Sequence, residues 1–221
     1  MKKLLILTVV VLSLGMTKHK DALTAQYPDK IKFNGIEYSL NSNPLEQYFE
    51  KHPGKRPKGE IMSTALWRGY VAHFEIIDKQ LFVTDIKIQV RDKNSENNSK
   101  IKWISVYKEV FPNTEKTKVD WYSSILILPY GKLISYVHLA YGSTYSNYWL
   151  IEIENGYSNE ARNYNYKEYT KFKKRQFLAF KKTKKYKHLF NELNDDNTDD
   201  ESVEDFIYQY ITEYTTKFLK E

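Results

Sequence analysis

The sequence predicts an α+β fold: an antiparallel sheet of hairpins with a short N-terminal helix and a C-terminal helical pair. Between residues 26 and 160, apolar and polar residues alternate with the period of half-buried strands, and Asn-Gly pairs mark tight turns. After residue 161 the apolar residues recur every three or four positions, as on an amphipathic helix. We therefore expect a strand-rich body over 26–160 and helices over 161–221 that pack on the same domain.

Residues 1–15 have the order of a secretory signal peptide. Lys2 and Lys3 precede an apolar run at 4–14, and small residues follow where a signal peptidase cleaves. The run is too short for a membrane-spanning helix, which needs about 20 apolar residues. We therefore expect export to the periplasm or the medium. Translation from Met16 is the open alternative, and it would leave a cytoplasmic protein.

Composition excludes several classes of protein. The chain has no cysteine, which rules out disulfides, thiolate zinc sites, a cysteine nucleophile and a lipid anchor on cysteine. It has no glycine-rich phosphate loop and no strained-turn serine motif of a hydrolase. No cofactor is therefore expected.

The first hairpin is predicted over residues 31–40. Asn34 and Gly35 form the pair that best adopts the positive φ angles of a type I′ turn, and strand-forming residues flank them. A polar loop at 53–57 follows some residues later.

A short helix is predicted over residues 44–51. Pro44 suits the first helical position, Asn43 offers a side-chain cap, and Glu46 is placed to reach back to that cap.

The clearest strands cover residues 70–77 and 81–90, joined by a loop at 78–80. We expect the register that leaves one face almost wholly apolar, because a shift by one residue would turn every side chain to the opposite face. In that register Tyr70, Ala72, Phe74 and Ile76 lie opposite Ile88, Ile86, Thr84 and Phe82. A mobile loop over 91–100 and a strand over 101–107 should follow.

Another hairpin is predicted over residues 119–128 and 132–141. Pro129 suits the second position of a type I turn, and Gly131 suits the left-handed residue that closes a three-residue loop. The core face of this hairpin would carry Trp121, Ile125, Ile127, Leu133, Val137 and Leu139. A further strand over 148–154 should end at the Asn-Gly pair that follows it.

The C-terminal region predicts two helices, over residues 167–193 and 202–219. The stretch 167–187 has ten Lys or Arg and one Glu, whereas 192–205 has eight acids and no base. A basic helix suits phosphates, anionic lipid or an acidic partner. Opposite charges so close in sequence favour attraction between the two segments instead, and we expect them to pair.

Several segments between residues 31 and 90 form a recognisable set: Asn34-Gly35, Tyr38, Asn43-Pro44-Leu45-Glu46, Tyr48-Phe49, His52-Pro53, Arg56-Pro57 and Leu66-Trp67-Arg68-Gly69-Tyr70. Together they resemble the opening of an uncharacterised group of bacterial proteins. The resemblance implies no known activity and assigns no functional residue.

The segment 66–70 is the first candidate binding site. Arg68 beside Trp67 offers a bidentate contact for a carboxylate or a phosphate, and Tyr70 adds aromatic surface. The structural alternative, which we favour, places Trp67 and Tyr70 in the core or at its rim. It pairs Arg68 with an acid of the same chain, and Gly69 marks a bulge.

His73, Asp85 and Glu75 form the second candidate. In the expected register His73 lies across from Asp85, and Glu75 lies two residues along on the same face. A histidine with two carboxylates suits a divalent metal or acid–base chemistry, but cross-strand polar pairs on a wet sheet face are common. His138 is a further isolated candidate. We assign no catalytic residue and no metal ligand.

The leading hypothesis is an exported, non-enzymatic protein-binding domain of the immunity or inhibitor type, which uses an aromatic and polar sheet face. The chain has nineteen tyrosines, and tyrosine is enriched at interfaces. The alternative is a hydrolase or a metal-dependent enzyme centred on His73, Asp85 and Glu75. Another protein is the expected partner, nucleic acid is not, and the mature chain should hold no transmembrane segment.

Export predicts a defined location and mass for the mature chain. If residues 1–15 are cleaved, protein taken from the periplasm or the medium of the native organism has the intact mass of a chain that begins at Met16. Mass spectrometry of each cell fraction checks this. Protein confined to the cytosol contradicts it.

Overall fold

The computed structural model describes residues 24–61, 63–93, 100–194 and 199–219, so the expected signal peptide lies outside the described residues. The strands are β1 (Asp29–Phe33), β2 (Ile36–Leu40), β3 (Val71–Ile77), β4 (Gln80–Arg91), β5 (Ile101–Ser105), β6 (Thr117–Lys118), β7 (Ser124–Ser135), β8 (Thr144–Glu154) and β9 (Tyr157–Asn165). The helices are α1 (Pro44–Lys51), α2 (Tyr107–Val110), α3 (Tyr166–Lys181), α4 (Lys184–Leu193), α5 (Asp200–Gln209) and α6 (Ile211–Tyr214).

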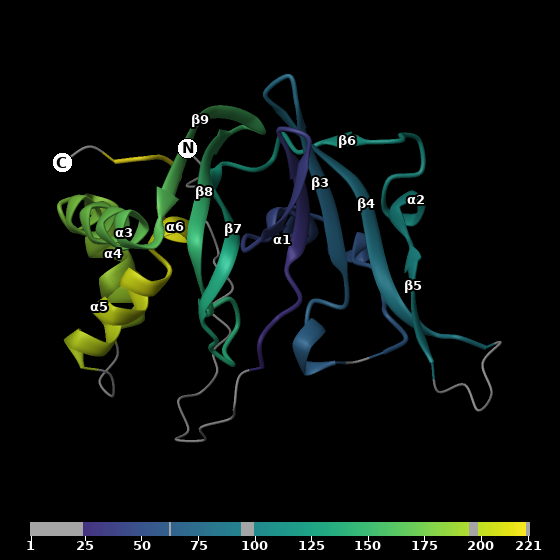
Figure 1. The fold of residues 1–221 in the computed structure, drawn as a ribbon, viewed down its shortest axis with the longest axis horizontal. Helices are drawn as coiled ribbons and strands as arrows, with labels where there is room; N and C mark the ends of the chain where they lie inside the picture. Colours follow the sequence, from purple (N-terminus) through teal and green to yellow (C-terminus); the bar gives the residue numbers. More distant parts are fainter. Residues whose placement is uncertain (1–23, 62, 94–99, 195–198, 220–221) are drawn as a thin grey trace, which may run out of the picture.

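The fold is mixed α+β with a mostly antiparallel open sheet, as the sequence predicts. The strand order is β2-β1-β3-β4-β9-β8-β7, with β5 and β6 also paired to β4. Strands β1 and β3 run parallel, and the other paired strands run antiparallel. The sheet falls into two halves, β1 to β6 on the right of Figure 1 and β7 to β9 left of centre.

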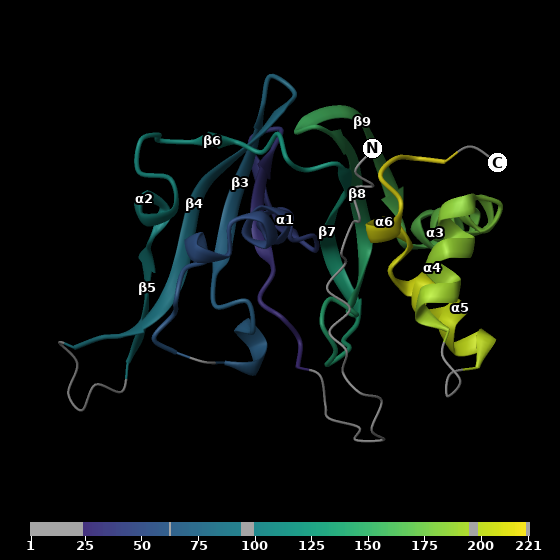
Figure 2. The same cartoon turned by 180° about the vertical axis from the view of Figure 1, so that it is seen from behind.

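The main hydrophobic core lies between the two halves. Helix α1 sits between them in both views (Figure 1 and Figure 2). The core draws side chains from both halves, among them Ile31, Tyr70, Phe74, Val83, Leu126 and Ile151. A second apolar layer covers the opposite face of β7 and β8, where α3 and the C-terminal tail pack, and it contains Ile125, Leu150, Phe172 and Phe218.

The two halves are hydrogen-bonded to each other at one corner. There the register pairs β4 with β9 at a single position, Gln80 with Tyr157. The carbonyl of Gly156 accepts from the backbone N–H of Leu81 at 2.8 Å and from Gln80 Nε2 at 3.0 Å, and Val119 N–H donates to Leu81 O at 3.0 Å. This corner, made by Gln80, Leu81, Val119 and Gly156, is called the junction below.

Two predicted turns are present. Asn34 and Gly35 join β1 to β2 with φ angles of 51° and 78°, as the type I′ turn requires. Asn155 and Gly156 end β8 with φ angles of 47° and 79°, and the chain returns as β9. The polar strand β9 was not expected, because its residues are mostly exposed and carry no apolar alternation.

The central hairpin keeps the predicted register only in part. Ala72 lies opposite Ile86 and His73 opposite Asp85, as expected, but Phe74 lies opposite Val83 rather than Thr84. The turn contains two residues, Asp78 and Lys79, both with positive φ, instead of the expected three at 78–80. A bulge absorbs the difference, and Thr84 donates its hydroxyl to His73 O at 3.2 Å. As a result Leu81 and Val83 are buried, and the expected core positions Phe82 and Thr84 are only partly buried.

The hairpin predicted around Pro129 is wrong. Pro129 lies inside β7, opposite Tyr148 of β8, which a strand at the end of the sheet tolerates. Gly131, with a φ of 80°, lies at a bulge rather than in a turn. The strand therefore continues to Ser135. Of the expected core positions, Ile125 is fully buried, Trp121, Ile127 and Val137 are partly buried, and Leu133 and Leu139 are exposed.

The strand predicted over 148–154 is confirmed as part of the longer β8, whereas other predicted elements are shorter than expected or divided. The strand over 101–107 ends at Ser105, and the loop over 91–100 falls partly outside the described residues. The helix over 167–193 breaks between α3 and α4, where Thr183 accepts from the Tyr186 N–H at 3.1 Å and so caps α4. The helix over 202–219 is two short helices, α5 and α6.

Helix α1 begins without the expected capping box. No side chain caps its first turn. The carboxamide of Asn43 accepts from the Tyr141 hydroxyl at 2.9 Å, and Glu46 binds Tyr70 and Arg56. Long-range partners therefore take both side chains away from the helix terminus.

The basic and acidic C-terminal segments meet over an apolar core. Phe180, Tyr186, Val203 and Ile207 are buried together, and Lys181 of α3 pairs with Glu204 of α5 at 2.5 Å. Because exposed ion pairs contribute only about 0 to 1 kcal/mol, the apolar contacts dominate this packing.

Substitution at the junction should cost more than at an open turn with the same backbone angle. In Gly156→Ala the new Cβ would lie 2.6 Å from Val119 O, whereas in Gly35→Ala it would meet nothing within 4 Å. The unfolding free energy of both variants should fall by about 1 to 2 kcal/mol because alanine disfavours the left-handed conformation. That of Gly156→Ala should fall by roughly 1 to 3 kcal/mol more because of overpacking. Urea unfolding of both variants measures the difference. Equal losses would show that the junction is not tightly packed.

Candidate functional site

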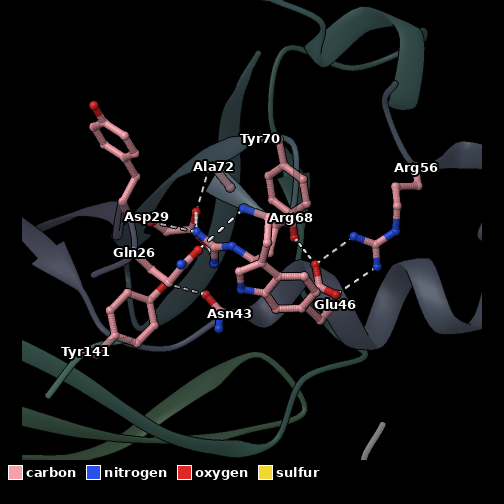
Figure 3. A network of polar contacts seen from close by, with 11 residues as sticks. Gln26, Asp29, Asn43, Glu46, Arg56, Arg68, Tyr70, Ala72 and Tyr141 are labelled. Carbon is pink, nitrogen blue, oxygen red and sulfur yellow. Dashed lines mark hydrogen bonds and ion pairs between the residues drawn. The ribbon is translucent and has the colours of Figure 1, made fainter. Parts of the chain in front are cut away.

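Arg68 of the segment 66–70 forms a buried ion pair with Asp29 (Figure 3). The terminal nitrogens of Arg68 donate to the two carboxylate oxygens of Asp29 at 3.2 and 3.4 Å and to the carbonyl of Tyr27 at 2.9 Å. Asp29 also accepts from the backbone N–H of Ala72 at 2.8 Å. Both charged side chains are almost completely buried. Arg68 therefore has its carboxylate inside the protein, as the structural alternative proposes.

Tyr70 extends this network to α1. Its hydroxyl donates to Glu46 Oε1 at 2.7 Å, and Arg56 donates to both Glu46 oxygens at 3.0 and 2.7 Å. Burial, reinforced by the negative charge of Glu46, raises the pKa of Tyr70 well above its ordinary value. The hydroxyl consequently stays protonated and remains a donor.

The charge state of the ion pair follows from its burial. Burial raises the pKa of Asp29 to about 6, against the attraction of Arg68. Burial opposes the charge of Arg68, but the Asp29 carboxylate together with Tyr141, Tyr70 and Glu46 raises the pKa of Arg68 above its usual value. Both groups are charged at neutral pH, and Asp29 becomes protonated in mild acid.

Gly69 belongs to a turn and not to the bulge that the sequence suggests. Its N–H donates to Leu66 O at 2.8 Å at the end of a short 3-10 turn, Thr64–Leu66, and its φ is 80°. The chain reverses there, so that Arg68 enters the core while Trp67 stays 57 % exposed.

The outward side of β3 and β4 carries the second candidate set. We call this surface, made by His73, Glu75, Asp85, Lys87 and Trp103, the open face. These residues share one side because they alternate along their strands, and Trp103 of β5 lies opposite Gln89 of β4. Helices α3 to α6 pack against β7, β8 and β9 on the far side of the molecule and leave the open face free (Figure 1).

Asp85 and Lys87 of the open face pair with each other, with 3.5 Å between Lys87 Nζ and Asp85 Oδ2, and the other polar contacts of Asp85 and Glu75 are to residues outside this set. Asp85 accepts from the Ser105 hydroxyl at 2.6 Å and from the Ile86 N–H at 2.8 Å, and Glu75 pairs with Lys32 at 3.1 Å. Partial burial, with Lys87 nearby, lowers the pKa of His73 below its ordinary value. His73 is therefore neutral at pH 7.

The described residues hold no metal centre at this place. Across residues 24–61, 63–93, 100–194 and 199–219, no three His, Cys, Asp or Glu side chains are close enough together to hold a metal ion. His138 lies elsewhere, on the tip between β7 and β8, where its Nδ1 is 2.8 Å from the Tyr136 hydroxyl. The arrangement of His73, Asp85 and Glu75 suits solvated cross-strand contacts.

An aromatic rim borders the open face, and sequence reasoning identified only one of its members. We use this name for Tyr27, Trp67 and Trp103. Tyr27 packs edge-on against Trp103, with ring centroids 5.9 Å apart. The side-chain oxygen of the neighbouring Gln26 accepts from the backbone N–H of Trp67 at 3.4 Å. No local signal joins these residues, because they come from three separate segments.

The tip of the β7–β8 hairpin is a second exposed apolar region. Its exposed side chains are Leu133, Ile134, Tyr136 and Leu139. The expected core role of Leu133 and Leu139 is wrong, because Leu133 lies near the end of β7 and Leu139 lies in the connection that follows it, and both side chains are exposed.

No protein-family model matches the chain, and neither curated proteins nor solved structures match it. In the described part of the chain, no helix combines the length and the apolar character needed to cross a bilayer.

The burial of Asp29 should appear in the pH dependence of stability. Because its pKa is about 6 in the folded chain and 3.8 for the free group, the folded state holds the proton more tightly. Its contribution is therefore complete below about pH 4 and falls by on the order of 3 kcal/mol as the pH rises through 6.

Asp29→Asn removes this titration. The unfolding free energy of the natural chain should fall more steeply between pH 4 and 6 than that of Asp29→Asn, as measured by urea unfolding at each pH. Parallel curves would show that the pKa of Asp29 is not raised.

Proposed function

We propose that the protein is an exported, non-enzymatic protein-binding domain of the immunity or inhibitor type, which contacts its partner through the open face and the aromatic rim. The observation that carries the proposal is the exposure of Trp67 and Trp103 beside a band of charged side chains. The resemblance of residues 31–90 to an uncharacterised group of bacterial proteins is compatible with this proposal but implies no activity.

The composition of this surface resembles that of known recognition sites. Tryptophan and tyrosine are enriched among the few residues that carry most of the binding energy of an interface, and a polar rim surrounds them. Lys32, Glu75, Asp85 and Lys87 bring both signs of charge to the open face. Such a mixture selects and orients a complementary partner more than it strengthens binding.

The rim is also held in place before any partner arrives. The backbone N–H of Tyr27 donates to Ala65 O at 2.9 Å, and its carbonyl accepts from the Arg68 side chain. Trp67 directly precedes that buried arginine. Pre-organised contact residues reduce the entropy lost on association.

The alternative, a hydrolase or metal-dependent enzyme, has less support. Its proposed groups do not converge on a common point, because Asp85 is bound to Ser105 and Glu75 to Lys32. Asp85 lies opposite His73, but its carboxylate already accepts from Ser105 and Ile86 and pairs with Lys87.

Site-specific photocrosslinking tests the proposal. A photoreactive benzoylphenylalanine replaces Trp67, and a matched variant carries it at Leu178, an exposed apolar residue of α3. Irradiation in the native organism should yield one discrete adduct from position 67 and none from position 178, with the partner identified by mass spectrometry.

Two results would contradict the proposal. If both positions gave the same mixture of many adducts, the rim would have no specific partner. A hydrolytic or metal-dependent activity that is lost in His73→Ala would favour the enzyme.

A further inference from the structure

Strand β5 forms an edge of the sheet. It pairs with β4 over five residue pairs, from Ser105 opposite Lys87 to Ile101 opposite Arg91, without a shift in register. In the part of the chain that the structure describes, no second strand pairs with β5. Along an antiparallel strand, about half of the N–H and C=O groups point away from the partner strand. Within the described residues, no other strand bonds to those groups of β5.

The side chains of this edge are apolar and exposed. Ile101, Trp103 and Ile104 are 55 %, 39 % and 38 % exposed, and every residue of β5 belongs to the exposed class. Trp103 also belongs to the aromatic rim and rests against Tyr27. An edge that offers backbone groups and apolar side chains together is a template for a further strand.

The usual protections of a sheet edge are weak here. Proteins guard such edges with proline, bulges, inward-pointing charges or a covering helix. β5 contains no proline and no bulge. Its one charged residue, Lys102, lies 3.3 Å from Asp92.

Charge identifies the strand that fits. At this edge residues 91–93 and 100–105 include four bases and one acid, Asp92, which pairs with Lys102, so two copies of the edge would bring regions of like net charge together, which disfavours strand pairing. An acidic strand would meet complementary charge. We propose that the partner adds an extended, acidic and apolar segment to β5 as a further antiparallel strand. This inference rests on the proposed function and specifies the chemistry of the partner.

The probes are short peptides whose backbone and charge can be varied separately. Ac-(Glu-Val)4-NH2 should bind at low salt, and Ac-(Lys-Val)4-NH2 should bind about tenfold or more weakly. A Glu-Val peptide with N-methyl groups on alternate residues keeps the side chains but loses one row of donors. It should fail to bind when the methyl groups lie on the row that faces β5.

Three variants locate the site. Trp103→Ala should weaken binding of the Glu-Val peptide about tenfold, and Lys102→Glu should reverse the preference toward the Lys-Val peptide. Leu133→Ala, at the exposed tip of the β7–β8 hairpin, is the matched control and should bind as the natural chain does. Calorimetric titration gives the affinities, and hydrogen exchange should show new protection of amides at 101–105.

Distinct outcomes separate this inference from the proposed function. If neither peptide binds, or both bind equally, while the crosslinked partner is retained at position 67, strand addition is wrong and the protein-binding role stands. Concentration-dependent dimers that are lost in Trp103→Ala would assign the edge to a second copy of the chain. Peptide binding with the expected charge preference, without any adduct at position 67, would support strand addition and count against the rim as part of the interface.

Discussion

The architecture depends on the junction between the two halves of the sheet. Gly156 has to place its carbonyl against Leu81 and Gln80 while its own N–H donates to Tyr122 O at 2.9 Å, and an added Cβ would lie 2.6 Å from Val119 O. Only glycine meets both the positive φ and this close approach without strain. The junction closes one corner of the main core, so the apolar faces of β3, β4, β7 and β8 are buried against each other rather than exposed.

The same arrangement makes the two halves different. β7 and β8 have two apolar faces, one toward the main core and one toward α3 and the C-terminal tail. β3 and β4 have one, and their other side carries the charged residues of the open face. A polar surface is therefore accommodated on β3 to β5 without loss of core packing, as the proposed binding role requires, whereas the corresponding side of β7 and β8 packs against α3 and the C-terminal tail.

Short sequence patterns predicted features that depend on neighbouring residues. They did not predict features that depend on contacts between distant segments. The turn at Asn34 and Gly35 depends on backbone preference alone, and it is present. Pro129 and Gly131 carry an equally good turn signal, but pairing of β7 with β8 across more than ten residues overrides it. In the candidate site, the facing of His73 and Asp85 followed from the hairpin pattern. The partner of Arg68 lies 39 residues away, at a distance where a single sequence shows no relation between the two residues.

The buried ion pair links the core to the aromatic rim. A buried pair contributes little net stability, because desolvation offsets attraction, so specificity of conformation is the better account of its presence. Asp29 lies in β1, and its partner Arg68 lies directly after Trp67 and also binds the carbonyl of Tyr27. A movement of Tyr27 away from the rim would remove the carbonyl to which the buried Arg68 donates, and a movement of Trp67 would disturb the residue directly before that arginine. The ion pair therefore ties the rim to the core through a carboxylate whose pKa burial raises to about 6.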